Sequence, residues 1–549
     1  MSQINHNKWI ATVARFAAVI LVALICVPAR AAAPGITGGA TNPRFDLSAE
    51  ANRITQPDGM SLYAWGYGCH TAPAGFSPAA IAGANCPTMQ IPGPTLIVHQ
   101  GDTVTVTLTN NLPAAAGNTS ILFPGFQVTP TGGVQGLLTQ EAAHGGTVTY
   151  TFVATTPGTH SYYSGTQGDL QIEMGLYGAV IVLPTVSGSL AVPTGCRTVG
   201  PTLPDGQTDF RNAAAAYNLS AACYDREYLF QFSEMDPRIH TQAEQQAGMA
   251  CARNSGCMTV ETEPYHPAYY MINGRSMPDD MDPNYSPQYP HQPYNGNPHM
   301  HPGELVLLRI IGTGRWQHPF HEHGNHVRIL ARDGNVLVSQ TDPTQPAGPL
   351  LFTTTTTPGI AMDGIFYWTG RGLNWDVYGH YPGAVYTDPD PKYAAFLGKP
   401  VVCIPDANGY YTQLDNGSGQ PNGVPNSASL APNYYEWCAD HNKPLEAHAF
   451  GNVGSGGPVT LPDSNILTNG AWYGGSPYLG PDATIRAVGA TGTSPPSNTI
   501  ANPPATEAGF AFMWHSHNER EITTNNIFPG GMMMMMLVDP QAFVIDESN

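Results

Sequence analysis

The 549-residue sequence has few charged side chains and no basic segment. Charged residues make up 11% of the chain, and Asp and Glu outnumber Lys and Arg by 40 to 21. Soluble domains typically contain about 25% charged residues. Because no run of Lys or Arg is present, neither nucleic acid nor an anionic membrane is expected as a partner. Glycine (60) and proline (51) are abundant instead, which favours short strands joined by turns over long helices.

The apolar segment near the N-terminus is too short to span a bilayer comfortably. It covers residues 16–27, follows Lys8 and Arg15, and precedes a small-x-small cleavage site at 29–31. These three parts are typical of an export signal, whereas a membrane anchor requires about 20 apolar residues. We therefore expect residues 1–31 to be a cleaved signal peptide, with no transmembrane anchor. The mature protein is expected to be secreted or periplasmic.

No cysteine lies beside a histidine-rich segment, so neither thiolate metal ligands nor a cysteine nucleophile is expected. Eight cysteines follow the signal peptide, and an even number favours disulfides outside the cytoplasm. Eight cysteines allow about 105 connectivities. Pairing between sequence neighbours predicts Cys69–Cys86, Cys196–Cys223, Cys251–Cys257 and Cys403–Cys438.

Four strand-like segments occur in the same order twice along the chain. In the segment 101–108, apolar and hydroxyl residues alternate as they do in a half-buried strand. The corresponding segments are 101–108 and 303–310, 120–125 and 317–324, 158–165 and 511–517, and 175–182 and 530–538. This repetition predicts two homologous β-sandwich domains.

The repeat also sets the expected domain organisation. We expect a first domain at 45–185, a linker of irregular structure at 186–221 and a second domain at 222–540. The second domain carries a Gly-, Pro-, Asn- and Tyr-rich insertion at about 376–505, which we expect to wrap the surface. The segment 265–301 is expected to be an ordered loop. Its residues His291, His299, Met300 and His301 are expected at a mobile surface, and the alternative is a weak, exposed copper site.

Three motifs in this layout resemble the multicopper oxidases. They are Gln90-Ile91-Pro92-Gly93-Pro94-Thr95, His318-Pro319-Phe320-His321-Glu322-His323-Gly324 and Trp514-His515-Ser516-His517. The first is similar to the N-terminal signature of that family, and the other two to its paired-histidine strands. The resemblance implies an all-β fold of two cupredoxin-like Greek-key β-sandwich domains, the second with a long insertion.

The two His-x-His pairs point to a metal site. Side chains at i and i+2 of a strand face the same way, so each pair presents two imidazoles together. If the two strands are neighbours, His321, His323, His515 and His517 enclose one space; the alternative is two surface pairs that never meet. Imidazole accepts copper or zinc, and the resemblance favours copper. The resemblance also adds His318, which matches a further histidine ligand of the family.

The resemblance also shows which copper ligands are missing. The first-domain positions that match ligand pairs hold Leu122 and Pro124, then Tyr163 and Gly165. We therefore expect a first domain without copper ligands.

In the second domain, Ser516 stands in the position of the thiolate cysteine, and Glu521 stands where a further histidine is expected. A serine hydroxyl cannot replace the thiolate, so a blue copper site is not expected. Glu519 and Glu521 are either partners of the histidine ring N–H groups or solvated turn carboxylates. The run Met532–Met536 is either core packing, which the matching strand of the first copy favours, or a set of thioether ligands for cuprous copper.

Two classes of function follow. One is an exported, atypical copper-dependent oxidoreductase that takes electrons from a small reductant or an electron-donor protein. A homo-oligomer is then one way to supply the missing histidines. The other is a non-catalytic copper-binding or scaffold protein of the cell envelope.

Overall fold

The computed structural model describes residues 33–203, 206–251, 256–301, 304–368, 475–478, 509–539, 544, 545 and 547. The predicted signal peptide, the Cys403–Cys438 pair and all of the predicted insertion except 475–478 lie outside these residues. Within the described part, no helix is both long and apolar enough to cross a bilayer.

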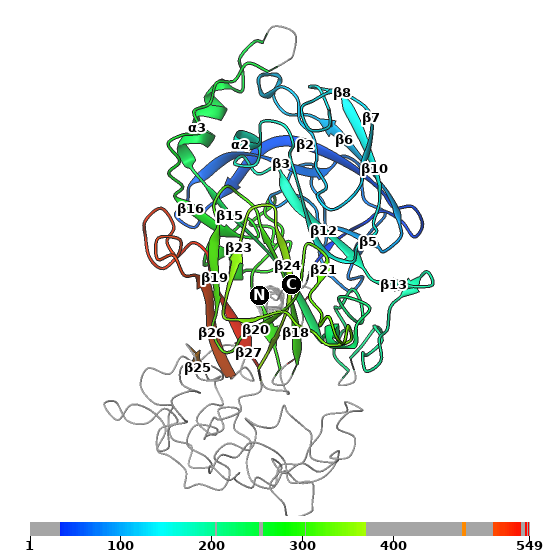
Figure 1. Ribbon diagram of the computed structural model, residues 1–549. Coiled ribbons are helices and arrows are strands. Elements are labelled where there is room, and N and C mark those ends of the chain that lie inside the picture. Colours follow the sequence, from blue (N-terminus) through cyan, green and yellow to red (C-terminus); the bar gives the residue numbers. More distant parts are fainter. Residues whose placement is uncertain are drawn as a thin grey trace, which may run out of the picture.

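The first sandwich consists of two five-stranded sheets, drawn in blue and cyan in Figure 1. One sheet has the strand order β11-β12-β5-β1-β4. Its strands are β1 (Gly35–Thr37), β4 (Gly75–Ser77), β5 (Leu96–His99), β11 (Gly158–Tyr163) and β12 (Tyr177–Leu183). The other has the order β3-β2-β6-β10-β7. Its strands are β2 (Arg44–Thr55), β3 (Ser61–Cys69), β6 (Thr103–Asn110), β7 (Thr129–Gly132) and β10 (Thr147–Val153).

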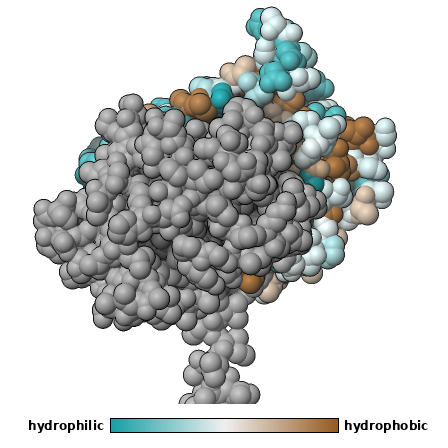
Figure 2. Space-filling model, turned by 90° about the horizontal axis from the view of Figure 1, so that it is seen from below, coloured by the Kyte–Doolittle hydropathy of each residue, from teal (hydrophilic) through white to brown (hydrophobic). Residues whose placement is uncertain are grey.

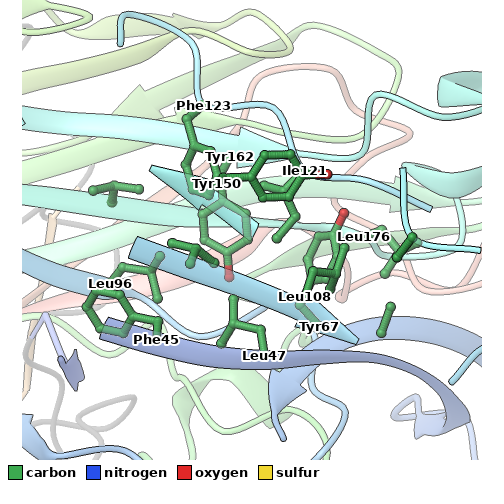
Figure 3. Packing of buried hydrophobic residues seen from close by; sticks show 14 of the residues in the cluster. Phe45, Leu47, Tyr67, Leu96, Leu108, Ile121, Phe123, Tyr150, Tyr162 and Leu176 are labelled. Carbon is green, nitrogen blue, oxygen red and sulfur yellow. The ribbon is translucent and has the colours of Figure 1, made fainter. Parts of the chain in front are cut away.

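The core between these two sheets follows from the alternation in their sequences. In β6, Val104, Val106 and Leu108 are fully buried, while the threonines between them face outward. Each such side chain contributes about 1.5–3 kcal/mol when it leaves water. Figure 3 shows leucines of both sheets packed against Tyr67 and Tyr162, whose hydroxyl groups reach backbone carbonyls.

The second sandwich, drawn in green to red in Figure 1, has a seven-stranded and a six-stranded sheet. The first of these consists of β15 (Arg226–Met235), β16 (Tyr269–Ile272), β18 (Leu305–Gly312), β20 (Val327–Arg332), β21 (Asn335–Val336), β22 (Leu350–Leu351) and β24 (Ala361–Tyr367). The second has the order β17-β27-β26-β19-β23, with β25 paired to β26. Its strands are β17 (His299–Met300), β19 (His318–Glu322), β23 (Thr353–Thr356), β25 (Gly475–Tyr478), β26 (Gly509–Ser516) and β27 (Met533–Val538). The predicted all-β fold is confirmed.

Short elements complete the described chain. They are the hairpins β8 (Val134–Gln135) with β9 (Gln140–Glu141) and β13 (Thr185–Val186) with β14 (Ser189–Leu190), the helices α2 (Gly168–Gln171) and α3 (Pro237–Gln246), and the 3₁₀ turns η1 (Ala114–Ala116), η2 (Ser220–Ala222) and η4 (Asp279–Met281). The β13–β14 hairpin begins the segment predicted as an irregular linker. Helix α3 was not anticipated; the Asp236 side chain caps it by accepting a hydrogen bond from the backbone N–H of Arg238 at 2.9 Å.

Three predicted disulfides are confirmed: Cys69–Cys86, Cys196–Cys223 and Cys251–Cys257. The described surface is mixed in character, and Figure 2 shows brown apolar side chains beside teal polar ones on it. Among the exposed apolar side chains is Leu137, between β8 and β9, at 93% exposure.

The prediction of surface histidines in 265–301 is wrong for two of them. His299 and His301 are buried, because β17 joins the edge of the second sheet next to β27. His299 Nδ1 lies 2.6 Å from an Asp539 carboxylate oxygen, and His301 Nδ1 lies 3.3 Å from Glu304. These two histidines are therefore part of the internal packing of the second sandwich.

Candidate metal centre

Strands β19 and β26 bring the two His-x-His pairs together. They are antiparallel neighbours in the six-stranded sheet, and their register sets His321 directly opposite His515. Phe320 and Trp514, the flanking residues of opposite phase, pack into the apolar core. This alternation forces the histidines onto the other face of the sheet.

Four imidazole rings meet on that face. The ring centroid of His321 lies 4.9 Å from that of His323, 5.5 Å from that of His515 and 4.7 Å from that of His517. The His515 ring lies 5.2 Å from the His323 ring and 5.4 Å from the His517 ring. The predicted convergence of the four rings is therefore what the structure shows.

Neighbouring groups fix the orientation of these rings. The Nδ1–H of His515 donates to the backbone carbonyl of Ser516 at 2.7 Å, which leaves its Nε2 lone pair facing the cluster. On the adjacent strand β23, Thr353 Oγ1 lies 2.7 Å from Nδ1 of His321. The indole N–H of Trp514 donates to the backbone carbonyl of His323 at 2.9 Å. Such hydrogen bonds to ligand residues are typical of metal sites.

The surroundings keep the buried rings neutral, which is the form that coordinates a metal. Burial, followed by the positive charges that His323, His517 and His515 acquire on protonation, lowers the pKa of His321 to about 4. Burial also lowers the pKa of His515. Protonation of the cluster would place like charges side by side.

The spacing of the nitrogens suits a single ion. One ligand nitrogen from each of His321, His323 and His515 lies within 4.8 Å of the others. Nε2 of His515 is 3.3 Å from Nε2 of His323. Two nitrogens that bind one ion at about 2 Å in tetrahedral geometry are separated by roughly this distance. These residues therefore fit a metal ion that imidazoles bind.

His517 forms the open side of the cluster. Its side chain is 52% exposed, and its Nδ1 lies 3.8 Å from the Glu519 carboxylate, which is also exposed. Phe352 lies against the His321 ring with centroids 5.6 Å apart. The cluster is thus buried on the sheet side and accessible from solvent at His517.

The structure places His318 away from the cluster and in a buried acid–imidazole–acid triad. Its Nε2 lies 2.9 Å from a Glu234 oxygen and its Nδ1 lies 2.9 Å from a Glu521 oxygen. Burial by itself lowers the pKa of His318, but hydrogen bonds to the two carboxylates and their charges raise it to about 9. With both ring nitrogens donating, His318 has no lone pair for a metal, so this geometry gives no support to its prediction as a ligand.

Ser516 is hydrogen-bonded to this triad through Glu521. The Ser516 hydroxyl donates a hydrogen bond to the Glu521 oxygen that also contacts His318. Of the two carboxylates left open by the sequence, Glu521 is therefore buried and hydrogen-bonded, while Glu519 is exposed. Glu234 was not anticipated as a site residue, because it precedes His318 by 84 residues in a strand with no motif of its own.

The corresponding region of the first sandwich contains aromatic side chains. Leu122 forms an isolated bridge with Tyr163, so the predicted strand at 120–125 is reduced to that one pair. The Phe123 ring is 5.9 Å from Tyr162 and 4.8 Å from Phe152. These rings pack in the core of the first sandwich, as Phe320 and Trp514 do in the core of the second.

Comparison with known proteins relates one part of the chain to a family. Residues 73–187, which lie in the first sandwich and directly after its last strand β12, match the multicopper oxidase family model. This segment belongs to the multicopper oxidase family. Membership implies copper as the cofactor. The histidine cluster lies outside the matched residues, so the site itself is defined by the geometry of the second sandwich.

Two relatives are laccases. Laccase-3 of Botryotinia fuckeliana is 35% identical over 114 residues, which are 20% of this chain and 24% of that protein. Laccase abr2 of Aspergillus fumigatus is 37% identical over 98 residues, which are 17% of this chain and 16% of that protein. The chain thus matches less than a quarter of the length of either relative.

The solved structures that the chain matches include copper oxidases. The multicopper oxidase mgLAC has a TM-score of 0.43 and 14% identity, with 92% of this chain and 88% of that chain covered. The blue copper oxidase of Nitrosomonas europaea has a TM-score of 0.37 and 20% identity, with 59% of this chain and 74% of that chain covered.

Proposed function

We propose that this chain is an exported copper-binding protein of multicopper oxidase type, and that His321, His323, His515 and His517 hold its copper. The observation that carries the proposal is the meeting of four imidazoles from β19 and β26, with two Nε2 atoms 3.3 Å apart. The donor set consists of four imidazoles, a ligand type that copper accepts.

The proposed activity is that of an atypical copper-dependent oxidoreductase. Copper bound at the cluster supplies one-electron chemistry toward a small reductant or an electron-donor protein. His517, at the open side, is the residue through which such a donor would reach the cluster. Thr353 and the Ser516 carbonyl hold the rings of His321 and His515 in place during this exchange. The blue copper site is absent from the proposal because Ser516 and Glu521 occupy its positions.

The second candidate is a non-catalytic copper-binding or scaffold protein of the cell envelope. The contact between Ser516 and Glu521 favours it, because the thiolate that would pass electrons to the cluster is replaced by a hydrogen-bonded hydroxyl. The first sandwich offers no imidazole at Leu122 or Tyr163. A second copy of the chain is one source of further ligands for an oxidase that needs them.

Metal analysis of the purified, full-length protein tests the binding. We expect about one copper per chain, a spin-resonance signal of a nitrogen-ligated cupric ion, and no intense blue absorption band. The H321A/H515A double variant should lose this copper. The H326A variant, which removes a nearby histidine in edge contact with Phe352, should keep it. Full copper occupancy in the double variant would place the metal elsewhere.

Turnover separates the two candidates. The copper-loaded protein is mixed with phenols, ferrous iron or cuprous copper, and oxygen consumption is followed. Oxygen uptake that disappears in H321A/H515A supports the oxidoreductase. Copper binding without uptake leaves the non-catalytic protein, and sedimentation with and without copper tests whether a second copy completes the site.

A further inference from the structure

The methionine run at the end of the second sandwich divides between the two faces of β27. Met532, Met534 and Met536 are fully buried members of the apolar core. Met533 and Met535 have the opposite phase and do not belong to that core cluster. The prediction of core packing for the run therefore holds for three of its members and not for the other two.

The strand register places the other two on the face that carries the histidines. Met533 lies directly opposite His515, and Met535 lies directly opposite Met513 of β26. His515 is in turn opposite His321. Directly opposed residues on one face of a sheet have Cβ atoms about 4.5–5.5 Å apart. One row across the sheet is thus Met533, His515 and His321.

A second row runs parallel to the first. It contains Met535 and Met513, and His323 comes level with them because it follows Glu322, the partner of Trp514. One pair further along, the same face has Leu537 opposite Ala511. In β26 and β27, thioethers therefore occupy this face beside the histidines and give way to aliphatic side chains beyond them.

Burial distinguishes these methionines from surface residues. Met533 is 3% exposed, and Met513 and Met535 are half-buried. The methionine side chain is unbranched and has three rotatable bonds, so its sulfur can reach a neighbour one strand away. Thioether sulfur is a soft ligand that selects cuprous over cupric copper, and imidazole accepts both.

We propose that Met513, Met533 and Met535 form a cuprous-ion site that adjoins the histidine cluster, with His515 as the nearest imidazole. This inference deepens the proposed function, because it assumes that the imidazoles hold copper and names Cu(I) as an ion that this face binds. The site would hold a cuprous ion beside the place where cupric copper is bound.

Leucine replacements on opposite phases of the same strands provide the test. The M513L/M533L/M535L variant removes the three thioethers on the histidine face and conserves side-chain volume. The matched control M532L/M534L/M536L removes three thioethers from the core. Cu(I) is titrated into each full-length protein in competition with a chromophoric chelator, and Ag(I) serves as a redox-inert probe.

We expect the histidine-face variant to bind Cu(I) and Ag(I) at least tenfold more weakly than the wild type, while the core variant binds as the wild type does. X-ray absorption should show sulfur around Cu(I) in the wild type and in the core variant only. Equal Cu(I) affinity in the wild type and the histidine-face variant would overturn the inference.

Cu(II) binding distinguishes the proposed histidine site from the proposed thioether site. It should be unchanged in the histidine-face variant and lost in H321A/H515A. If the wild type binds no Cu(II), the histidine proposal fails, whereas sulfur-ligated Cu(I) would still establish the thioether site. If the wild type binds Cu(II) and the two methionine variants have the same Cu(I) affinity, only the proposed thioether site is wrong.

Discussion

The triad of Glu234, His318 and Glu521 makes the stability of the second sandwich depend on pH. The pKa of His318 is about 9 in the folded chain, against 6.5 for an unperturbed histidine. A group whose pKa is raised by folding stabilises the fold fully below its unfolded pKa, and this stabilisation is lost as the pH rises through the folded value. The difference between 9 and 6.5 corresponds to about 3 kcal/mol. We therefore expect the free energy of unfolding to fall by about this amount between pH 6.5 and 9.

Other buried groups titrate in the same interval, so the measurement requires a reference variant. Burial raises the pKa of Glu322 to about 8, and its contribution is also lost on the way from about pH 4.5 to 8. In H318Q the triad has no titrating imidazole, while Glu322 is unchanged. The difference between the wild type and H318Q at each pH isolates His318.

Urea unfolding from pH 5 to 10, followed by tryptophan fluorescence, gives the free energies. The stability advantage of the wild type over H318Q should shrink by about 3 kcal/mol from pH 6.5 to 9 and stay constant below pH 6. In E521Q, which removes one carboxylate charge from His318, the loss should begin at lower pH. Parallel curves for the wild type and H318Q would refute a proton held between the two carboxylates.

Two further predictions concern a hydrogen bond to the histidine cluster and a disulfide. T353V removes the hydroxyl that lies 2.7 Å from Nδ1 of His321. We expect its copper affinity, measured by competition titration, to fall about 10- to 100-fold with little change in stability. The control T355V changes an exposed residue of the same strand and should leave copper affinity and stability unchanged. The C196S/C223S variant lacks the Cys196–Cys223 disulfide, which joins cysteines 27 residues apart in the sequence. We expect its free energy of unfolding in urea to be lower by about 3–4 kcal/mol. An unchanged midpoint of urea unfolding would mean that the disulfide constrains the unfolded chain little.

Much of the fold follows from local patterns. The alternation at 101–108 predicts β6, and the apolar strand at 175–182 predicts β12, because a two-residue period defines a half-buried strand without knowledge of its partner. The three confirmed disulfides join cysteines that are neighbours in sequence. Helix α3 was missed because its ten residues form one short amphipathic segment in a β-rich chain, and only Asp236-Pro237 marks its start.

The site was predictable to the extent that it depends on phase within a strand. Two His-x-His pairs need only the i, i+2 rule and the assumption that their strands are neighbours. The role of His318 depends on Glu234, which comes from the facing sheet and gives no local signal. The sequence also does not show which side of the sheet each methionine of Met532–Met536 faces. Five identical residues have no hydrophobic period, and only the pairing of β27 with β26 fixes their phase.

The family match and the metal centre lie in different halves of the chain, and this separation has a physical reason. Residues 73–187 contain the strands β4 to β12 of the first sandwich, whose buried Val, Leu and Tyr side chains form much of its core. The architecture of this sandwich is stabilised by its own core, as the aromatic packing around Phe123 illustrates. In the second sandwich, by contrast, four imidazoles face one another around a space that suits a cation. The affinity of this chain for copper should therefore depend on the pairing of β19 with β26 and not on residues 73–187.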